Sequence, residues 1–206
     1  MFVITADQVA SRRERDRAGG LVDELTQRHG DELLFPPDQT AGDEIQLVTR
    51  SAATALAIVL DVTRIGRWSV GVGVGGIRMP LPDAARKASG SAFIAAREAV
   101  GAAKRAEGRF ALRAAGDHAR PAADVEALVR LLVLLRERRT DHGWEVVELM
   151  RAGRRQKEAA ALLAVTPAAV SARLKAAMWR AEEDARPGLE RLLAELDAES
   201  ERAATT

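Results

Sequence analysis

The sequence predicts an α+β protein, in which a sandwich of strands and helices precedes an all-helical part. Two observations support this fold class. Short apolar runs alternate with segments of helical period up to about residue 113, whereas every periodic segment after residue 121 has helical spacing. Hydrophobic residues make up 47% of the 206 residues and charged residues 30%, which is typical of a chain that folds around a core.

The first half is predicted to follow the order β-α-β-β-α-β-α-β. Ser51 is placed to cap one helix and Asp83 another, whereas Gly19, Gly20 and Gly90 are weak points within helical segments. A turn-rich connection separates the second and third strands. The expected strands are residues 2–7, 33–35, 44–48, 68–77 and 109–113, and the expected helices are residues 12–29, 51–65 and 83–105.

Residues 114–121 form the expected linker between two predicted domains, residues 1–113 and residues 122–206. The second domain is predicted to be helical throughout. A helix over residues 124–139 comes first, and three shorter segments precede a last helix over residues 189–201. The buried stripe of the first helix is expected to consist of Val125, Leu128, Val129, Leu132 and Leu135.

The composition excludes several classes of site. The chain has no cysteine, which excludes disulfide scaffolds, thiolate zinc sites, iron–sulfur clusters and cysteine nucleophiles. Its longest apolar stretch, residues 52–60, is far shorter than the roughly 20 residues that span a bilayer. The first residues lack the basic start of a signal peptide. We therefore expect a cytoplasmic protein with no membrane partner.

A helix-turn-helix pattern lies within residues 144–180. Ala159 and Ala160 are small enough for a second helix to pass close by, and a three-residue turn follows their helix. Thr166 then provides an N-cap, and Pro167 occupies the first helical position, where its missing N–H costs nothing. These residues predict one bracing helix and one helix that is presented to a partner.

The second helix of this pattern has one apolar face and one face suited to DNA. Val170 and Leu174, four residues apart, are expected to point inward. The residues left outward are short or cationic, as contact with the major groove requires. The predicted DNA-binding residues are Arg155, Gln156, Thr166, Ala168, Ala169, Ser171, Arg173 and Lys175.

The pattern resembles the helix-turn-helix of sigma-factor region four and of related bacterial regulators. The resemblance implies a partner of double-stranded DNA, and the one mild departure is Ala159, where the consensus has isoleucine. The residues that match the consensus in register are Gln156, Glu158, Ala160, Leu163, Val165, Thr166, Val170 and Ser171.

Charge is segregated along the second half. Residues 151–180 carry seven cations and one acid, whereas residues 181–206 carry three cations and eight acids, although the net charge of the whole chain is only +1. A basic motif set apart from an acidic tail suits phosphate binding. The alternative is a helical bundle with a solvated basic face, but a bundle does not require a Thr-Pro cap at this position.

Carboxylates of the first half are candidates for a Mg²⁺ site. Asp7 ends the first strand, and Asp43 with its neighbour Glu44 begins a hairpin strand, and these strands can lie side by side. Two nearby carboxylates repel unless a hard cation joins them, and Mg²⁺ prefers such oxygen ligands. The alternative is structural, because a Gly-Asp turn is common in hairpins and Asp7 is also placed to cap the next helix.

The first half resembles the palm domain of nucleotidyl and diguanylate cyclases, and more closely the SatD family of bacterial proteins. The SatD resemblance covers about residues 2–113 and rests on the motifs at residues 6–12, 42–46 and 90–97. It implies a ferredoxin-like or cyclase-like palm sandwich that binds a purine nucleotide or a cyclic nucleotide. The candidate nucleotide-binding residues are Ser11, Arg12, Gly42 and Arg97.

Three further glycines match the sequence pattern of a dinucleotide-binding loop but lack the structural context that such a loop requires. Gly71, Gly73 and Gly76 have the required spacing, but Pro80 follows them where the motif requires a helix to begin. We expect these glycines instead to let a helix pack closely against a strand.

The sequence therefore predicts a DNA-binding transcriptional regulator with a degenerate cyclase-like domain that senses a nucleotide or a Mg²⁺–nucleotide. A homodimer is expected, with the apolar helix at residues 124–139 as its contact. Two alternatives stay open. One is a small Mg²⁺-dependent nucleotidyl cyclase with a helical regulatory module, although Ala41 stands where active diguanylate cyclases carry glycine. The other is an interaction protein whose helical half binds a protein partner.

Overall fold

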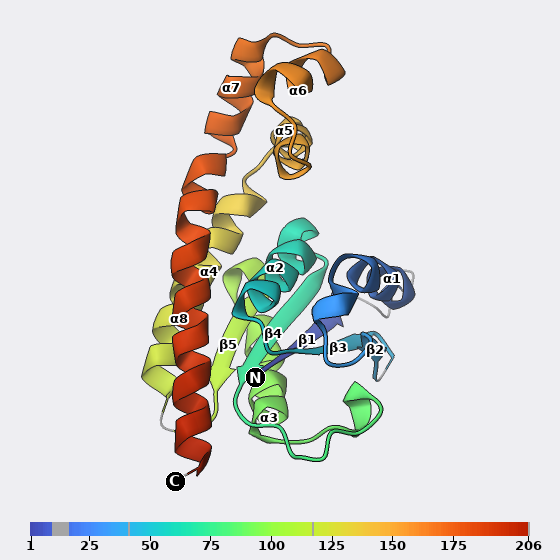
Figure 1. The fold of residues 1–206 in the computed structure, drawn as a ribbon, viewed down its shortest axis with the longest axis vertical. Helices are drawn as coiled ribbons and strands as arrows, with labels where there is room; N and C mark the ends of the chain where they lie inside the picture. Colours follow the sequence, from blue (N-terminus) through green and yellow to red (C-terminus); the bar gives the residue numbers. More distant parts are fainter. Residues whose placement is uncertain (10–16, 41, 117, 206) are drawn as a thin grey trace.

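The computed structural model describes residues 1–9, 17–40, 42–116 and 118–205, with side chains to residue 202. Over these residues the chain forms a five-stranded mixed sheet with helices on both faces. A group of helices extends beyond one end of the sheet (Figure 1). The α+β class that the sequence predicts is therefore confirmed.

The sheet contains β1 (Phe2–Gln8), β2 (Asp38–Gln39), β3 (Glu44–Thr49), β4 (Trp68–Val74) and β5 (Phe110–Ala114). Their order in space is β2-β3-β1-β4-β5. β1 pairs antiparallel with β3 on one side and with β4 on the other, β2 pairs antiparallel with β3, and β5 is parallel to β4. In this register Asp7 lies opposite Glu44.

The α-helices of the described residues are α1 (Ala18–His29), α2 (Ala52–Val62), α3 (Ser91–Ala103), α4 (Ala119–Glu137), α5 (Asp141–Arg151), α6 (Gln156–Leu162), α7 (Pro167–Ala176) and α8 (Trp179–Thr205). Ser51 caps α2 as predicted, because its hydroxyl accepts the Thr54 N–H at 3.1 Å. Short 3₁₀ turns occur at Gly30–Glu32, Thr63–Ile65, Ala85–Lys87 and Glu107–Arg109.

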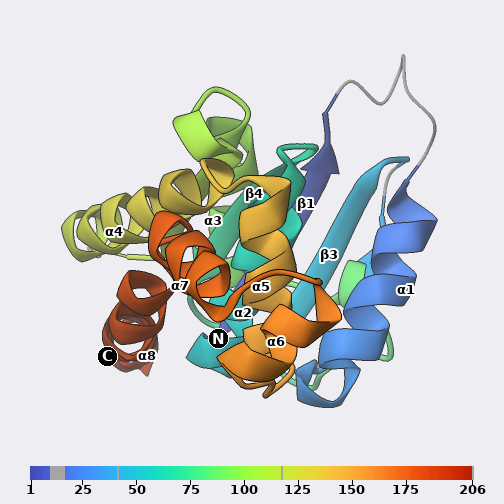
Figure 2. The same cartoon turned by 90° about the horizontal axis from the view of Figure 1, so that it is seen from above.

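The two faces of the sheet are covered by different helices. The face that carries Phe2 and Ile4 packs against α1, α2, α4 and α8 in one apolar core, to which Leu189 and Leu193 of α8 contribute. The other face packs against α3. Figures 1 and 2 show α4 and α8 side by side along the sheet. Residues on both sides of the expected linker at residues 114–121 therefore share one core, because α4 and α8 pack against the sheet.

The strand expected at residues 33–35 does not form. Leu33 makes only a single bridge to Thr49. Pro36 and Pro37 follow, and proline has no N–H to donate to a longer ladder. The pairing with β3 therefore falls to β2, which lies within the segment expected to be a connection.

Three expected helix starts are also wrong. The helix expected from Asp83 begins at Ser91, because Gly90 has a φ of +148°, which is incompatible with a helix. α4 begins at Ala119, ahead of the expected start at residue 124, and carries Pro121 in its first turn, where proline is tolerated. The last helix begins at Trp179 rather than at residue 189.

Among the described residues, no single helix is long and apolar enough to cross a membrane. α6 and α7 meet that criterion only when they are taken together across the bend between them, and on length and composition alone.

The close contact between α3 and β4 depends on two glycines, as the sequence predicts. A Cβ atom added to Gly73 would lie 2.1 Å from the Ala92 carbonyl oxygen and 2.3 Å from the Ala96 nitrogen. A Cβ added to Gly71 would lie 2.1 Å from the Val100 nitrogen. These are backbone atoms, which cannot change rotamer as a side chain can. A larger residue at either position must therefore move α3 away from the sheet.

We expect Gly73→Ala to destabilise the protein by about 3 kcal/mol, because the added methyl group overpacks the contact between α3 and β4. Gly101→Ala is the matched control, since nothing lies within 4 Å of its added Cβ and alanine favours a helix. Urea unfolding followed by circular dichroism measures both. Equal midpoints for wild type and Gly73→Ala would contradict the packing described here.

Candidate nucleic-acid interface

Residues 141–177, which contain α5, α6 and α7, form a unit that we call the head; the remaining described chain is the body. The head has an apolar core of its own, separate from the core of the sheet. Ala159 and Ala160 are buried where α6 contacts α7, as their size predicts. The members of the head core are Trp144, Val146, Val147, Ala159, Ala160, Val170, Leu174 and Ala177.

Local bonds fix the turn between α6 and α7. The Thr166 hydroxyl accepts the Ala169 N–H at 3.1 Å, and Pro167 is the first residue of α7, as predicted. Glu158 accepts the Arg155 N–H at 2.9 Å at the start of α6. The two helices meet at 105°, within the range of about 90–120° that helix-turn-helix units adopt.

Most of the predicted DNA-binding residues lie on one exposed side of the head. Ala169 is half-buried. Arg173 differs from the expectation that it points outward: its Nη1 lies 3.3 Å from Glu145 Oε2 of α5, so this cation braces the head. The exposed members of the predicted set are Arg155, Gln156, Thr166, Ala168, Ser171 and Lys175.

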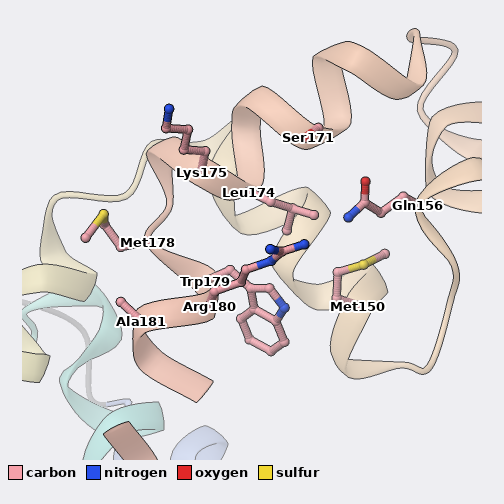
Figure 3. A pocket seen from close by; sticks show the side chains of 9 residues that line it. All are labelled: Met150, Gln156, Ser171, Leu174, Lys175, Met178, Trp179, Arg180 and Ala181. Carbon is pink, nitrogen blue, oxygen red and sulfur yellow. The ribbon is translucent and has the colours of Figure 1, made fainter. Parts of the chain in front are cut away.

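An open hollow of about 530 Å³ lies beside α7 on this side of the head. Its polar lining includes Gln156, Ser171 and Lys175, which the sequence analysis selected for DNA binding. Figure 3 shows Leu174 between Lys175 and Gln156, with Met150 below them. Three predicted residues thus share one concave surface, which sequence reasoning missed because α5, α6, α7 and α8 all contribute to it.

A buried carboxylate joins the head to the body. Glu182 of α8 is fully buried and accepts hydrogen bonds from Arg136 of α4 and from Arg139, which follows α4. It also accepts one from Arg151 of α5 at 2.8 Å. We call Glu182, these three arginines and Trp144 of α5 the joint.

The arginines of the joint extend its contacts to other helices. Arg136 donates to the Leu60 carbonyl of α2 at 3.0 Å, and Arg139 donates to the Ala177 carbonyl after α7 at 2.7 Å. The guanidinium carbons of Arg136 and Arg139 each lie 4.9 Å from the centroid of the Trp144 ring, a distance that permits cation–π attraction. The sequence carries one overlooked signal, because Arg136 continues the buried stripe of α4 where an apolar residue is expected.

Burial and charge oppose each other in the joint. Burial by itself raises the pKa of Glu182, but the charges of Arg136, Arg139 and Arg151 outweigh it and hold the pKa below the ordinary value of 4.5. Burial lowers the pKa of Arg136 to about 10, against the attraction of Glu182, so Arg136 stays protonated at neutral pH. The joint is therefore charged throughout the neutral range.

We expect Glu182→Gln to lower the free energy of unfolding by about 3 kcal/mol at neutral pH, because the buried guanidinium groups of Arg136 and Arg139 lose their counterion. The folded-state pKa of Glu182 lies below 4.5, so its contribution is present above that pH and is lost as the pH falls further. The difference between wild type and variant should therefore narrow in acid. Urea unfolding across pH measures this, with the exposed neighbour Glu183→Gln as control. A difference independent of pH would contradict the linkage.

A second candidate site lies in the body, on the face of the sheet that carries α3. There a groove of about 670 Å³ has Glu44 and Gln46 of β3 and Arg97 of α3 in its lining, together with Arg78 and Arg86 from the segment between β4 and α3. The metal candidate Glu44 and the nucleotide candidate Arg97 therefore share one groove. Three arginines and one carboxylate among the described lining residues favour an anionic ligand.

The three metal candidates lie at one end of β1 and β3. Glu44 lies opposite Asp7 and shares its face of the sheet. The Asp43 carbonyl accepts the Gln8 N–H at 3.3 Å. Lys104 Nζ lies 2.7 Å from Asp7 Oδ2 and supplies a positive charge there. The described residues contain no group of three histidine, aspartate or glutamate side chains placed to hold a metal, so a Mg²⁺ site at these carboxylates stays a prediction.

Of the other three nucleotide candidates, the structure describes Gly42. Gly42 is exposed in the turn before β3 with a φ of +65°, a conformation that glycine adopts without strain. Ser11 and Arg12 lie outside the described residues. Arg97 is thus the one candidate of the four that the structure both describes and places in the groove.

The fold and these sites define a protein with a sheet-based body and a three-helix head joined by buried charge. Comparisons of the chain with models of protein families, with curated proteins and with solved structures find no match. Its function is therefore inferred from its own residues.

Proposed function

We propose that the protein is a transcriptional regulator that binds double-stranded DNA through α6 and α7, with α7 as the recognition helix. The observation that carries this proposal is the 105° crossing of α6 and α7 with a Thr166-capped α7 whose outer side is exposed. Ala168 and Ser171 are short enough to approach base edges, and Lys175 is placed for a phosphate. The cations of residues 151–180 support the same partner.

The order of the strands supports the proposal that the body is a ferredoxin-like or cyclase-like palm sandwich. β2, β3, β1 and β4 follow one another in space and are all antiparallel, while α1 and α2 pack on one face. β5 and α3 add a parallel strand and a helix on the opposite face. The groove beside β3 lies on the same face as this added helix, and Arg97 of the helix lines it.

We expect Lys175→Ala to weaken duplex binding several-fold at low salt and to reduce the slope of log affinity against log salt by about 0.9, the effect of one lost phosphate contact. Fluorescence anisotropy with a duplex selected from a random pool measures both quantities. Lys87→Ala, which removes an exposed lysine of the body, is the control and should change neither. The proposal fails if the wild-type protein binds no duplex at low salt, or if the two lysine variants have the same affinity and the same salt dependence.

The groove favours a second role, the sensing of a nucleotide by the body. Its arginines suit phosphate groups, while Phe93 and the exposed Ile94 offer apolar surface beside them. Mg²⁺ would enter with the nucleotide, and Asp7, Asp43 and Glu44 remain its candidate protein ligands. A cyclase is less favoured, because Asp7 is engaged by Lys104.

Titration with Mg²⁺ and a panel of GTP, ATP and cyclic nucleotides tests this role through the melting temperature. A ligand at about 100 times its Kd should add about 2.7 kcal/mol of stability, a shift of several degrees. Arg97→Ala should abolish the shift, whereas Arg105→Ala, an exposed arginine away from the groove, should retain it. A shift that survives Arg97→Ala would place the ligand elsewhere.

A further inference from the structure

The outer side of α4 and α8 carries an apolar strip that no part of the described chain covers. Leu131 is 64% exposed, Leu128 46% and Leu192 37%, the first two on α4 and the third on α8. Leu128 and Leu131 are one turn apart and therefore lie on one side of α4. Because α4 and α8 lie side by side, these leucines belong to one surface, which we call the leucine face.

The contacts within the chain show which residues of α4 and α8 lie level with each other. Arg136 contacts Glu182 near the head, and His118 lies 3.9 Å from Glu199 at the opposite end. The two helices are therefore antiparallel, and each step toward the N-terminus of α4 matches a step toward the C-terminus of α8. Asp124 is then within one turn of Arg191 in height, and Arg120 is within one turn of Glu195.

We infer that the leucine face binds a second copy of this chain, in a dimer whose two-fold axis runs parallel to α4 and α8. Such an axis places α4 of one copy against α8 of the second copy at the same height. The leucines of α4 then meet Ala185 and Leu192, while Asp124 meets Arg191 and Arg120 meets Glu195. All of these charged residues are exposed in the single chain.

Charge complementarity and area both favour a second copy over another occupant. The two opposite-charge pairs occur twice in the dimer, one set on each side of the axis. The face is about 28 Å long for a helix of 19 residues and about 18 Å wide for two packed helices, which gives about 1,000 Å² of buried surface for two copies. That area is about the minimum for a specific interface.

The same axis places both heads at one end of the dimer. Two heads at one end would contact two half-sites of one duplex. Only this consequence of the inference rests on the proposed function. The association itself needs no DNA. The two proposals can therefore fail separately.

Charge reversal in two separate chains tests the pairing. We expect Asp124→Arg alone and Arg191→Asp alone to weaken self-association roughly tenfold, because each homodimer then opposes like charges twice. An equimolar mixture of the two variants should recover a dimer of twice the 22.1 kDa chain mass, because every pair in the heterodimer has opposite charges. Contacts within one chain cannot produce this recovery. Light scattering and sedimentation measure the masses, and a mixture that stays weak overturns the pairing.

Leu131→Asp tests the apolar strip and should weaken the dimer by at least about a hundredfold, since one leucine is lost from each copy. Ile65→Asp is the control, because Ile65 is 61% exposed outside this face. A wild-type chain that is monomeric, or a dimer unaffected by Leu131→Asp, overturns the inference and leaves the face to another protein or to solvent. A monomer that binds duplex would leave the proposed function intact, whereas a dimer that binds none would overturn that function alone.

Discussion

The placement of the head depends on one buried carboxylate. Glu182 loses all contact with water, and such a loss is offset only when the charge is fully paired and hydrogen-bonded. Its three arginine partners come from α4, from α5 and from the connection between them, and two of them also donate to carbonyls of α2 and of the residue after α7. A single anion thus connects the helices that cover the sheet with those that would meet DNA. The head is therefore held to the body by a buried, polar joint.

The elements that could be predicted from the sequence are those whose cause is local. Thr166 and Pro167 define the start of α7 through bonds within four residues. The contact of Gly71 and Gly73 with α3 is tertiary, and it could be predicted because glycines within a strand themselves indicate the close approach of another backbone. The strand at residues 33–35 was predicted from apolar content alone, although the prolines that follow prevent a ladder. A predicted helix boundary was wrong where one residue has a backbone conformation that a helix cannot contain. Gly90, with its positive φ, is an example, since the helix begins after it although the periodic pattern starts earlier.

The parts of the sites that could not be predicted depend on contacts between distant segments. Arg173 has the spacing of an outward cation, and only the position of Glu145 on α5 brings it into an ion pair on the surface of the head. The groove is lined by β3 and α3, which are far apart in the sequence, so Glu44 and Arg97 are separate candidates at the level of the sequence and one site only in the fold. The register that places Glu44 opposite Asp7 and the approach of Lys104 to Asp7 are likewise tertiary facts.

The groove and the joint lie on opposite faces of the sheet, which limits how a ligand could act on the head. A ligand in the groove would contact β3 and α3, whereas the joint rests on α2, α4 and α8. Coupling therefore requires that the ligand favour one of two placements of the helices on the far face. The leucine face lies on α4 and α8, which are two of those helices. A second copy would therefore contact both helices on their outer side, while the pair of Glu182 with Arg136 joins them on their buried side. If α7 is the recognition helix, as proposed, the dimer would set the distance between its two copies, and the DNA would have to supply half-sites at that spacing. The contacts of the joint would then determine which half-site separation is selected.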